Sequence, residues 1–308
     1  MSIAIFFDQR NPERWVQLLS EALPETAIEV YPEIKDPGKV TFALCWKPEK
    51  DVLSQFPNLR VVQSIGAGVD HIFNSQQLPD AVKVCRIVDP QLTQDLFEYV
   101  IAGIMGYIRG FPKYSTDQVN NRWKPKRYKT IAQTSVTVLG LGVIGSFIAQ
   151  ELAKIGFKVR GWSRSRKTVE GVKTYDLSEL LDAINESDVL INVLPLTPET
   201  ENILDKSLMS HLADHGYVIN VGRGQHLIEN DLIDLIEGNK LSGALLDVFR
   251  TEPLPEDHPF WSNSKITITP HVASITTLEN AVDIAIRNWK NLQNEKPLEY
   301  EVNAVLRY

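Results

Sequence analysis

The stretch VTVLGLGVIG, residues 136–145, decides the fold of this chain. Its first four residues are three apolar residues and a β-branched threonine, which predict a buried strand, and the spacing of Ala149, Leu152 and Ile155 predicts a helix directly after it. A GxGxxG motif between a strand and a helix is typical of a dinucleotide-binding βαβ unit, because its glycines let backbone N–H groups approach a pyrophosphate at the helix N-terminus. The alternative is a glycine-rich turn of an unrelated α/β protein. The predicted cofactor contacts here are Gly140, Gly142, Val143, Ile144 and Gly145.

Strands and helices alternate on both sides of this motif. Strands are expected at residues 3–7, 27–30, 42–45, 59–63 and 84–87, and again at 135–139, 158–162, 189–194, 217–221, 244–249 and 266–269. Helices are expected at residues 11–23, 92–109 and 276–293, among others. This alternation predicts the α/β class, with parallel sheets covered by helices. The two halves of the 308-residue chain look like two copies of one architecture, and the length favours two domains.

One stretch breaks the alternation. Residues 111–130 are rich in Arg, Lys and Pro and show little periodicity, so they predict an extended arm or loop. The helix before them, residues 92–109, carries apolar residues on more than one face, which is typical of a helix that is buried all round. We therefore expect a homodimer with this helix in its interface. The alternative is an interior helix of a monomer beside a mobile loop.

The segment after the strand at 158–162 indicates which dinucleotide is bound. An NAD site has Asp or Glu at this position, where the carboxylate accepts hydrogen bonds from ribose hydroxyls. This chain has WSRSRK, residues 162–167, which offers cations and hydroxyls but no carboxylate. Such a cluster favours a 2′-phosphate through charge-assisted hydrogen bonds, whereas the alternative is a solvated basic loop. We therefore expect NADPH to bind better than NADH. The predicted contacts are Ser163, Arg164, Ser165 and Arg166.

Three polar residues follow three consecutive predicted strands of the second half. Arg223 lies in NVGRG, Glu252 in DVFRTEP and His271 in TPHVAS. Ligands bind at the carboxyl ends of strands in open α/β sheets, so these side chains are expected to meet at one edge. Their chemistry suits reduction of a 2-keto acid: His271 donates a proton, Glu252 orients and charges the imidazole, and Arg223 binds the carboxylate and polarises the carbonyl.

Each of these residues also has a structural interpretation. A histidine after a proline is often structural, and a glutamate before a proline is often a turn residue. An arginine between two glycines is harder to explain by packing. Because the three residues occur together in a chain with a dinucleotide-binding motif, the catalytic interpretation is favoured for Arg223, Glu252 and His271. The other histidines, His71, His211, His215, His226 and His258, are assigned to surface or loop positions.

These motifs resemble those of the D-isomer-specific 2-hydroxyacid dehydrogenases over the whole chain, and in particular the glyoxylate/hydroxypyruvate reductase A branch. The segments that carry the resemblance are IGAGVD (65–70), WSRS (162–165), LPLTPET (194–200) and TPHVAS (269–274), together with Trp46. The resemblance implies two Rossmann-like domains with the active site in the cleft between them. A flavodoxin-like substrate domain would comprise residues 1–98 plus 274–308, and an NAD(P)-binding Rossmann domain residues 99–273.

The resemblance also implies the reaction, which is NADPH-dependent reduction of glyoxylate to glycolate and of hydroxypyruvate to D-glycerate. A dehydrogenase of larger 2-keto acids, or a cofactor-sensing regulatory protein on the same fold, are the alternatives. The implied substrate contacts are Trp46, Ile65, Gly66, Ala67, Gly68, Arg223 and His271. Further implied cofactor contacts are Leu194, Pro195, Val221, Arg223 and Asp247. The ring of Trp46 would restrict the substrate to small acids, unless it only packs in a domain core.

Composition limits the partners. The formal net charge of −7 argues against nucleic acid and anionic membranes, and no apolar run is long enough to span a bilayer. Cys45 and Cys85 lie in apolar runs with neither metal-ligand spacing nor a disulfide framework, so we expect core thiols, no metal site and a reducing cytoplasm. The expected partners are a small keto acid, the cofactor and a second copy of the chain.

Overall fold

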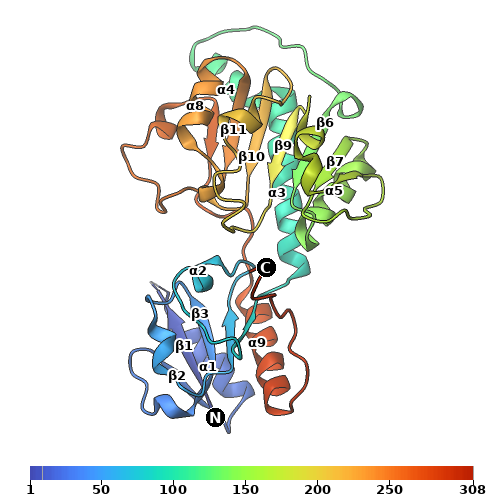
Figure 1. Ribbon diagram of the computed structural model, residues 1–308. Helices are drawn as coiled ribbons and strands as arrows, with labels where there is room; N and C mark the ends of the chain where they lie inside the picture. The colour runs from blue at the N-terminus through green and yellow to red at the C-terminus, as the bar shows by residue number, and fades with distance from the viewer. Residues whose placement is uncertain (9, 308) are drawn as a thin grey trace. The chain divides into compact units, whose positions relative to one another are not determined.

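Buried strands and amphipathic helices alternate along the chain. The strands form two parallel sheets, each in a structural unit of its own (Figure 1). The structure, a computed structural model, describes residues 1–8 and 10–307. Unit 1 comprises Met1–Pro90 and Thr276–Tyr308, and unit 2 comprises Gln91–Ile275. The sequence placed these divisions at about residues 98 and 274, and its last position, 308, lies outside the described residues. The first division falls earlier because helix α3 (Pro90–Arg109) packs with the unit 2 sheet.

Unit 1 is built on a five-stranded parallel sheet with the strand order β2-β1-β3-β4-β5. Its strands are β1 (Ser2–Phe7), β2 (Ala27–Val30), β3 (Val40–Trp46), β4 (Val61–Ser64) and β5 (Lys83–Cys85). Along β1, Ile3 and Ile5 belong to one buried cluster and Ala4 and Phe6 to another, because successive side chains point to opposite faces. Helices α1 (Glu13–Ala22) and α9 (Leu278–Gln293) cover the first face, and α2 (Asp70–Phe73) packs on the second.

Both cysteines belong to the core of unit 1. Cys45 lies on β3 and Cys85 ends β5, and both are fully buried and free. Burial raises the pKa of the Cys85 thiol to about 12 and raises the pKa of the Cys45 thiol further. The expectation of core thiols is therefore confirmed.

Unit 2 is built on a seven-stranded parallel sheet with the strand order β12-β11-β10-β9-β6-β7-β8. Its strands are β6 (Ser135–Leu139), β7 (Lys158–Trp162), β8 (Lys173–Tyr175), β9 (Val189–Asn192), β10 (Gly216–Asn220), β11 (Leu241–Leu246) and β12 (Ile266–Ile268). The chain starts at β6 and builds outward to β8, then returns to β9 on the other side of β6. This reversal is the topological switch point of a Rossmann sheet, where dinucleotides bind.

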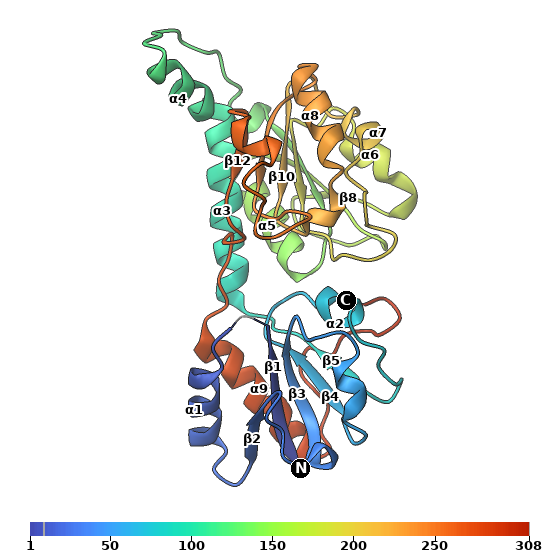
Figure 2. The ribbon, with the colours of Figure 1, turned by 90° about the vertical axis from the view of Figure 1, so that its left-hand side faces the viewer.

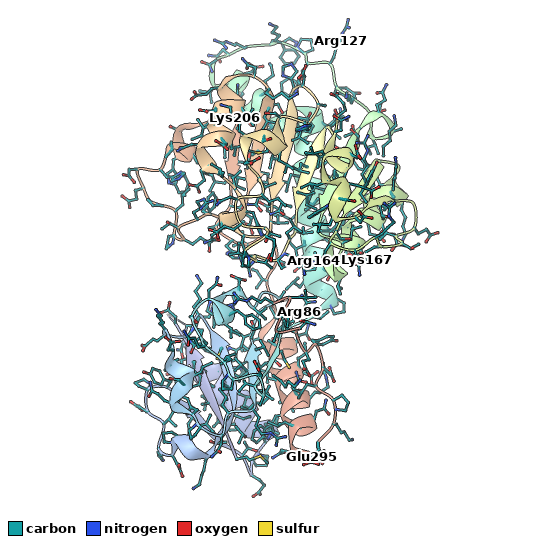
Figure 3. The ribbon with its side chains drawn as sticks, viewed as in Figure 1. Arg86, Arg127, Arg164, Lys167, Lys206 and Glu295 are labelled. Atoms are coloured by element: carbon teal, nitrogen blue, oxygen red, sulfur yellow. The ribbon has the colours of Figure 1, made fainter. Side chains whose placement is uncertain are left out.

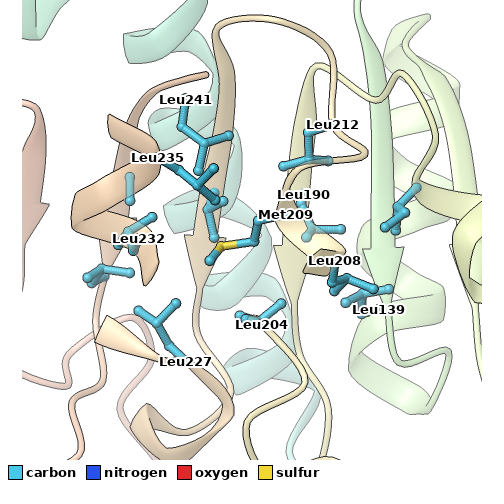
Figure 4. Close-up of a cluster of buried hydrophobic side chains, with 14 of the residues drawn as sticks. Leu139, Leu190, Leu204, Leu208, Met209, Leu212, Leu227, Leu232, Leu235 and Leu241 are labelled. Atoms are coloured by element: carbon cyan, nitrogen blue, oxygen red, sulfur yellow. The ribbon is translucent and has the colours of Figure 1, made fainter. Parts of the chain in front are cut away.

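Helices α5 (Val143–Ile155), α6 (Leu180–Ile184), α7 (Lys206–Met209) and α8 (Glu229–Glu237) complete unit 2 with α3. Figure 4 shows part of its core, in which leucines and Met209 fill the space between strands β9 to β11 and the helices beside them. Leu190, Leu212 and Leu241 are there completely buried. This core fixes the strand ends that carry the predicted catalytic residues.

Two segments differ from the sequence prediction. Residues 111–119 of the predicted arm form helix α4 (Phe111–Val119), which projects from the end of α3 away from the sheet (Figure 2), and only residues 120–130 lack regular structure. Gly110, with a φ of +73°, and Pro112 in the first turn allow this helix to begin. Most of its residues are exposed and its buried residue is Asp117, so no buried apolar stripe revealed it. The short edge strand β8 was also not predicted.

The sequence predicts burial of the helix at 92–109 in a homodimer, and the single chain buries one face of it. In α3, Leu92, Leu96, Val100, Ile104 and Ile108 are buried at a spacing of four residues and form one stripe. A Cβ added at Gly103 would lie 2.4 Å from the side chain of Leu245, so the helix rests closely on β11, whereas one at Gly106 would meet nothing within 4 Å. No helix among residues 1–8 and 10–307 is both long and apolar enough to cross a membrane.

Candidate active site

The predicted catalytic residues follow the carboxyl ends of neighbouring strands in unit 2. Arg223 follows β10, Glu252 follows β11 and His271 follows β12. Because these strands are parallel and adjacent, their carboxyl ends meet at one edge of the sheet. The Arg223 and Glu252 loops touch directly, since a Cβ added at Gly224 would lie 1.9 Å from the backbone of Phe249.

The structure pairs His271 with Glu252. Nδ1 of His271 lies 2.9 Å from Oε2 of Glu252, and Oε1 of Glu252 accepts a hydrogen bond from the backbone N–H of Phe249 at 3.1 Å. A carboxylate only accepts, so Nδ1 carries the hydrogen, and Nε2 is the ring nitrogen left for chemistry. The His271 side chain is 42% exposed and that of Glu252 26%, so the pair is accessible to a ligand.

Asp247 holds the loop that carries His271. It is 2% exposed, and its oxygens accept hydrogen bonds from Thr269 Oγ1 at 2.6 Å, Val272 N at 2.8 Å and Ala273 N at 2.9 Å, while its backbone carbonyl accepts from His271 N at 2.8 Å. A buried carboxylate needs such partners. They also keep His271 at a φ of +54°, which a side chain adopts only when its surroundings enforce it. The sequence predicted Asp247 as a cofactor contact and missed this role.

The glycines of residues 140–145 have the geometry of a dinucleotide loop. Gly140 has a φ of +101°, and a Cβ at Gly145 would lie 1.7 Å from the carbonyl oxygen of Gly140, so only glycine allows helix α5 to pack this closely on the turn. A Cβ at Gly142 would meet nothing within 4 Å, and Gly142 and Val143 are exposed at the start of α5. The open backbone of Gly142 therefore suits a pyrophosphate at the helix N-terminus.

The loop after β9 lies beside the glycine loop. A Cβ at Gly140 would lie 3.2 Å from the backbone nitrogen of Leu194, which with Pro195 follows β9. Val221 follows β10, the next strand of the sheet. The predicted cofactor contacts of these loops thus share the carboxyl edge of the sheet with the glycine loop.

The basic loop after β7 differs from its prediction in one respect. Arg166 is paired with two carboxylates, Asp176 at 3.3 Å and Glu179, which come from the segment after β8. Ser163 is largely buried, and its hydroxyl donates to the carbonyl of Ser165. The Arg164 side chain is 45% exposed, and its ion pair with Glu199 is long, at 3.9 Å. Figure 3 marks Arg164 and Lys167 on this loop. Arg164 and Lys167 are therefore better placed than Arg166 to meet a phosphate.

The predicted substrate loop of unit 1 follows β4. The N–H of Ile65 donates to the carbonyl of Cys45 and that of Gly66 to Ser64 Oγ, so these two amides are used within unit 1. The Ser64 hydroxyl in turn donates to the carbonyl of Gly68 at 2.9 Å and closes the loop. In the described residues, the amides of Ala67 and Gly68 are the ones left to face an anion.

Trp46 is the last residue of β3 and lies against this loop. A Cβ at Gly66 would be 2.7 Å from the indole, so the ring covers the Gly66 backbone. The guanidinium of Arg10 stacks on the indole at 4.3 Å, and the ring of His71 lies 5.0 Å away. The sequence predicted Trp46 but missed Arg10, because a cation 36 positions earlier in the chain gives no local signal.

The structure corrects the prediction for His226. The sequence assigned it to a surface or loop position, but it is completely buried and bonded to Asn192 and to the backbone of Arg223. Its position just after the Gly222-Arg223-Gly224 turn carried no apolar pattern that would have indicated burial. Across residues 1–8 and 10–307, no group of three or more His, Cys, Asp and Glu side chains is arranged to hold a metal ion.

A glycine loop open to a pyrophosphate and a histidine with a carboxylate partner are what hydride transfer to a carbonyl requires, and they define a dinucleotide-dependent oxidoreductase. The sequence model of the D-isomer specific 2-hydroxyacid dehydrogenase NAD binding domain matches residues 101–273. Relatives at more than 30% identity cover the full chain, so the chain belongs to the D-isomer specific 2-hydroxyacid dehydrogenase family.

The relatives point to one branch of that family. The chain is 37% identical to glyoxylate/hydroxypyruvate reductase A of Serratia proteamaculans over 100% of both chains, and 36% identical to that of Yersinia enterocolitica over 94% of both. Among solved structures, an NADPH-dependent glyoxylate/hydroxypyruvate reductase of Sinorhizobium meliloti with NADP and sulfate has a TM-score of 0.92 at 33% identity, covering 100% of both chains. A family member of Xanthobacter autotrophicus with NADPH and MES has a TM-score of 0.93 at 33% identity, covering 100% of this chain and 99% of that one.

Proposed function

We propose that this protein reduces glyoxylate to glycolate and hydroxypyruvate to D-glycerate with NADPH. The observation that carries the proposal is the His271–Glu252 pair, 2.9 Å apart, beside the Arg223 loop at the carboxyl edge of the Rossmann sheet. The names of the bacterial relatives and the NADP(H) bound in the solved ones support the substrates and the cofactor.

The cofactor site is proposed in unit 2. The glycine loop and the N-terminus of α5 hold the pyrophosphate, and Arg164, Lys167 and the Ser165 hydroxyl hold the 2′-phosphate, which is the reason for preferring NADPH to NADH. Leu194, Pro195 and Val221 are the proposed contacts further along the same edge. Bound NADPH supplies the hydride that reduces C2 of the keto acid.

Residues of the chain bind the negative charge of the substrate and donate the proton that completes the reaction. Arg223 is the residue of unit 2 proposed to bind the substrate carboxylate and polarise the carbonyl. The amides of Ala67 and Gly68 are the anion contacts proposed for unit 1. When C2 gains its hydrogen, the carbonyl π bond breaks and its electron pair becomes an alkoxide. His271 donates its Nε2 proton to that oxygen and becomes neutral, while Glu252 keeps the Nδ1–H aligned. The product is the 2-hydroxy acid.

Trp46 is proposed to set the size of the substrate. Its indole lies against the Gly66 backbone, and the Arg10 guanidinium stacks on the ring, so two contacts hold it. A rigid ring beside the carboxylate-binding loop leaves little room for a large group on the keto acid. Hydrophobic pockets discriminate by only about 1–3 kcal/mol per methylene, so weak activity on pyruvate is expected.

The test is a steady-state comparison of glyoxylate, hydroxypyruvate, pyruvate and phenylpyruvate with NADPH and with NADH. We expect the highest kcat/KM for the first two acids with NADPH. Trp46→Ala should raise the kcat/KM for phenylpyruvate relative to glyoxylate. A wild-type preference for phenylpyruvate contradicts the proposed substrates, and equal efficiency with both cofactors contradicts the proposed cofactor.

A homodimer is proposed through unit 2. Ile101 and Met105 on α3 are half-buried, and the large apolar residues of the following segment are exposed. These are Phe111 at 61%, Val119 at 82%, Trp123 at 101% and Tyr128 at 56%. A group of exposed apolar residues on one segment is typical of an interaction surface, and the family resemblance implies an arm that embraces a second copy.

A cytoplasmic location is also proposed. The buried free cysteines support it, because free thiols persist in a reducing compartment.

A further inference from the structure

His226 lies inside unit 2 between two loops of the proposed active site. It ends the short turn Gly224–His226 and is 0% exposed. Beside it are Asn192 and Asn220, the last residues of β9 and β10, which are register partners and also fully buried. These three polar side chains are enclosed where β9 and β10 release their loops.

The hydrogen bonds around His226 fix its protonation. Nδ1 accepts the backbone N–H of Arg223 at 3.1 Å and faces the amide nitrogen of Asn192 at 2.8 Å. The Asn192 amide is oriented by its oxygen, which accepts the N–H of Leu194 at 3.3 Å. Nε2 lies 3.2 Å from the carbonyl oxygen of Pro195, which can only accept. His226 is therefore neutral, with its hydrogen on Nε2.

The same network holds the backbone of Arg223 from both sides. Its N–H donates to His226, and its carbonyl accepts from the side-chain nitrogen of Asn220 at 3.0 Å. The Asn220 oxygen accepts from Asn192 at 2.9 Å, so the two asparagines join the contacts into one network. The backbone of Arg223 therefore has little freedom, and its side chain starts from a fixed point.

We propose that His226 is a positioning residue that sets Arg223 for the keto acid and ties it to the Pro195 loop. Its Nδ1 orients the proposed substrate-binding arginine, and its Nε2 orients a loop of the proposed cofactor site. The proposal rests on the role of Arg223 in the proposed function. In this role His226 is a buried residue that does not contact the substrate but determines how well the Arg223 side chain is oriented toward it.

Two substitutions separate the halves of the imidazole. In His226→Asn the amide oxygen takes the place of Nδ1, so the acceptor for Arg223 N–H is kept. In His226→Gln the amide nitrogen takes the place of Nε2, so the donor to Pro195 is kept and the acceptor for Arg223 is lost. Leaving that buried N–H unpaired is expected to raise KM for glyoxylate and lower kcat, with kcat/KM falling about tenfold or more in His226→Gln. The loss in His226→Asn should be several-fold smaller.

Both variants are measured with thermal unfolding, NADPH affinity and glyoxylate kinetics, beside Arg223→Ala. Equal losses in the two variants, in step with their stability, would make His226 merely structural, and unchanged kinetics in both would overturn the proposal. If Arg223→Ala itself retains wild-type kinetics, the proposed role of Arg223 fails; if only His226→Gln does, the inference about His226 fails alone. Should neither variant fold, ¹⁵N NMR of the wild-type histidines decides, because a charged ring or a bare Nε2 at His226 contradicts the network.

Discussion

At the scale of single residues, His271 owes its position to groups that touch no substrate. Glu252 orients the ring, and Asp247 holds the loop at a left-handed φ. The sequence predicted the His271–Glu252 contact, because both residues follow adjacent parallel strands. It could not predict the role of Asp247, because that role depends on hydrogen bonds to a loop more than 20 residues later. Nor could it predict that Arg166 is paired, since its carboxylates come from beyond another strand.

His271→Ala should remove most of the turnover and leave NADPH binding near normal. Loss of a general acid typically costs about 100- to 10,000-fold in rate. Steady-state kinetics with glyoxylate measure the loss, and NADPH fluorescence titration measures binding. The exposed His215 of the same unit offers a control, and His215→Ala should keep wild-type turnover. Turnover retained in His271→Ala would exclude this residue from the proton transfer.

Arg164 and Arg166 form a matched pair for testing the cofactor preference. Arg164→Ala should weaken NADPH binding about tenfold or more without affecting NADH, because a hydrogen bond to a charged group contributes roughly 1.5–3 kcal/mol. Arg166→Ala should weaken NADPH binding less, since Asp176 and Glu179 already pair with that guanidinium. Binding titrations of both dinucleotides check this. A loss shared equally by NADPH and NADH would show that Arg164 does not bind the 2′-phosphate.

At the scale of elements, most strands and long helices follow from the sequence, because parallel strands buried on both faces give continuous apolar runs. Strands β6 and β7 begin and end where they were expected. The strand expected at 244–249 instead ends at Leu246, because the apolar residues Val248 and Phe249 are buried in the loop after it. Helix α4 and strand β8 escaped prediction because α4 buries no apolar stripe and β8 has only three residues at a sheet edge.

The turn from β6 to α5 gives a prediction that separates binding from folding. Gly145→Ala should destabilise the protein by roughly 1–3 kcal/mol, because its Cβ would overlap the carbonyl of Gly140. Gly142→Ala should change stability by no more than about 0.5 kcal/mol, because its Cβ meets nothing within 4 Å, yet the methyl group would occupy the space proposed for the pyrophosphate. Thermal unfolding and NADPH titration distinguish the two. Normal NADPH affinity in Gly142→Ala would place the pyrophosphate elsewhere.

At the scale of the whole molecule, the exposed apolar residues after α3 form the proposed interface of the homodimer. The sequence pointed to α3 and the following segment as an interface, but it did not predict that residues 111–119 of that segment form helix α4. Light scattering at micromolar concentration should give a mass of two chains, whereas a single species of 34.8 kDa contradicts the dimer. Replacing Phe111 and Trp123 by serine should shift the protein toward the monomer. Trp261→Ser, at a second exposed tryptophan, should leave the mass unchanged.

The burial of both native cysteines also makes the protein suitable for site-specific labelling. Cys45 and Cys85 are enclosed in the unit 1 core, and their raised pKa values keep them as thiols rather than reactive thiolates at neutral pH. A cysteine introduced on an exposed residue of each unit would then react with a maleimide dye while the native ones stay intact. Energy transfer between two such dyes would follow the separation of the units in solution as NADPH and a keto acid are added.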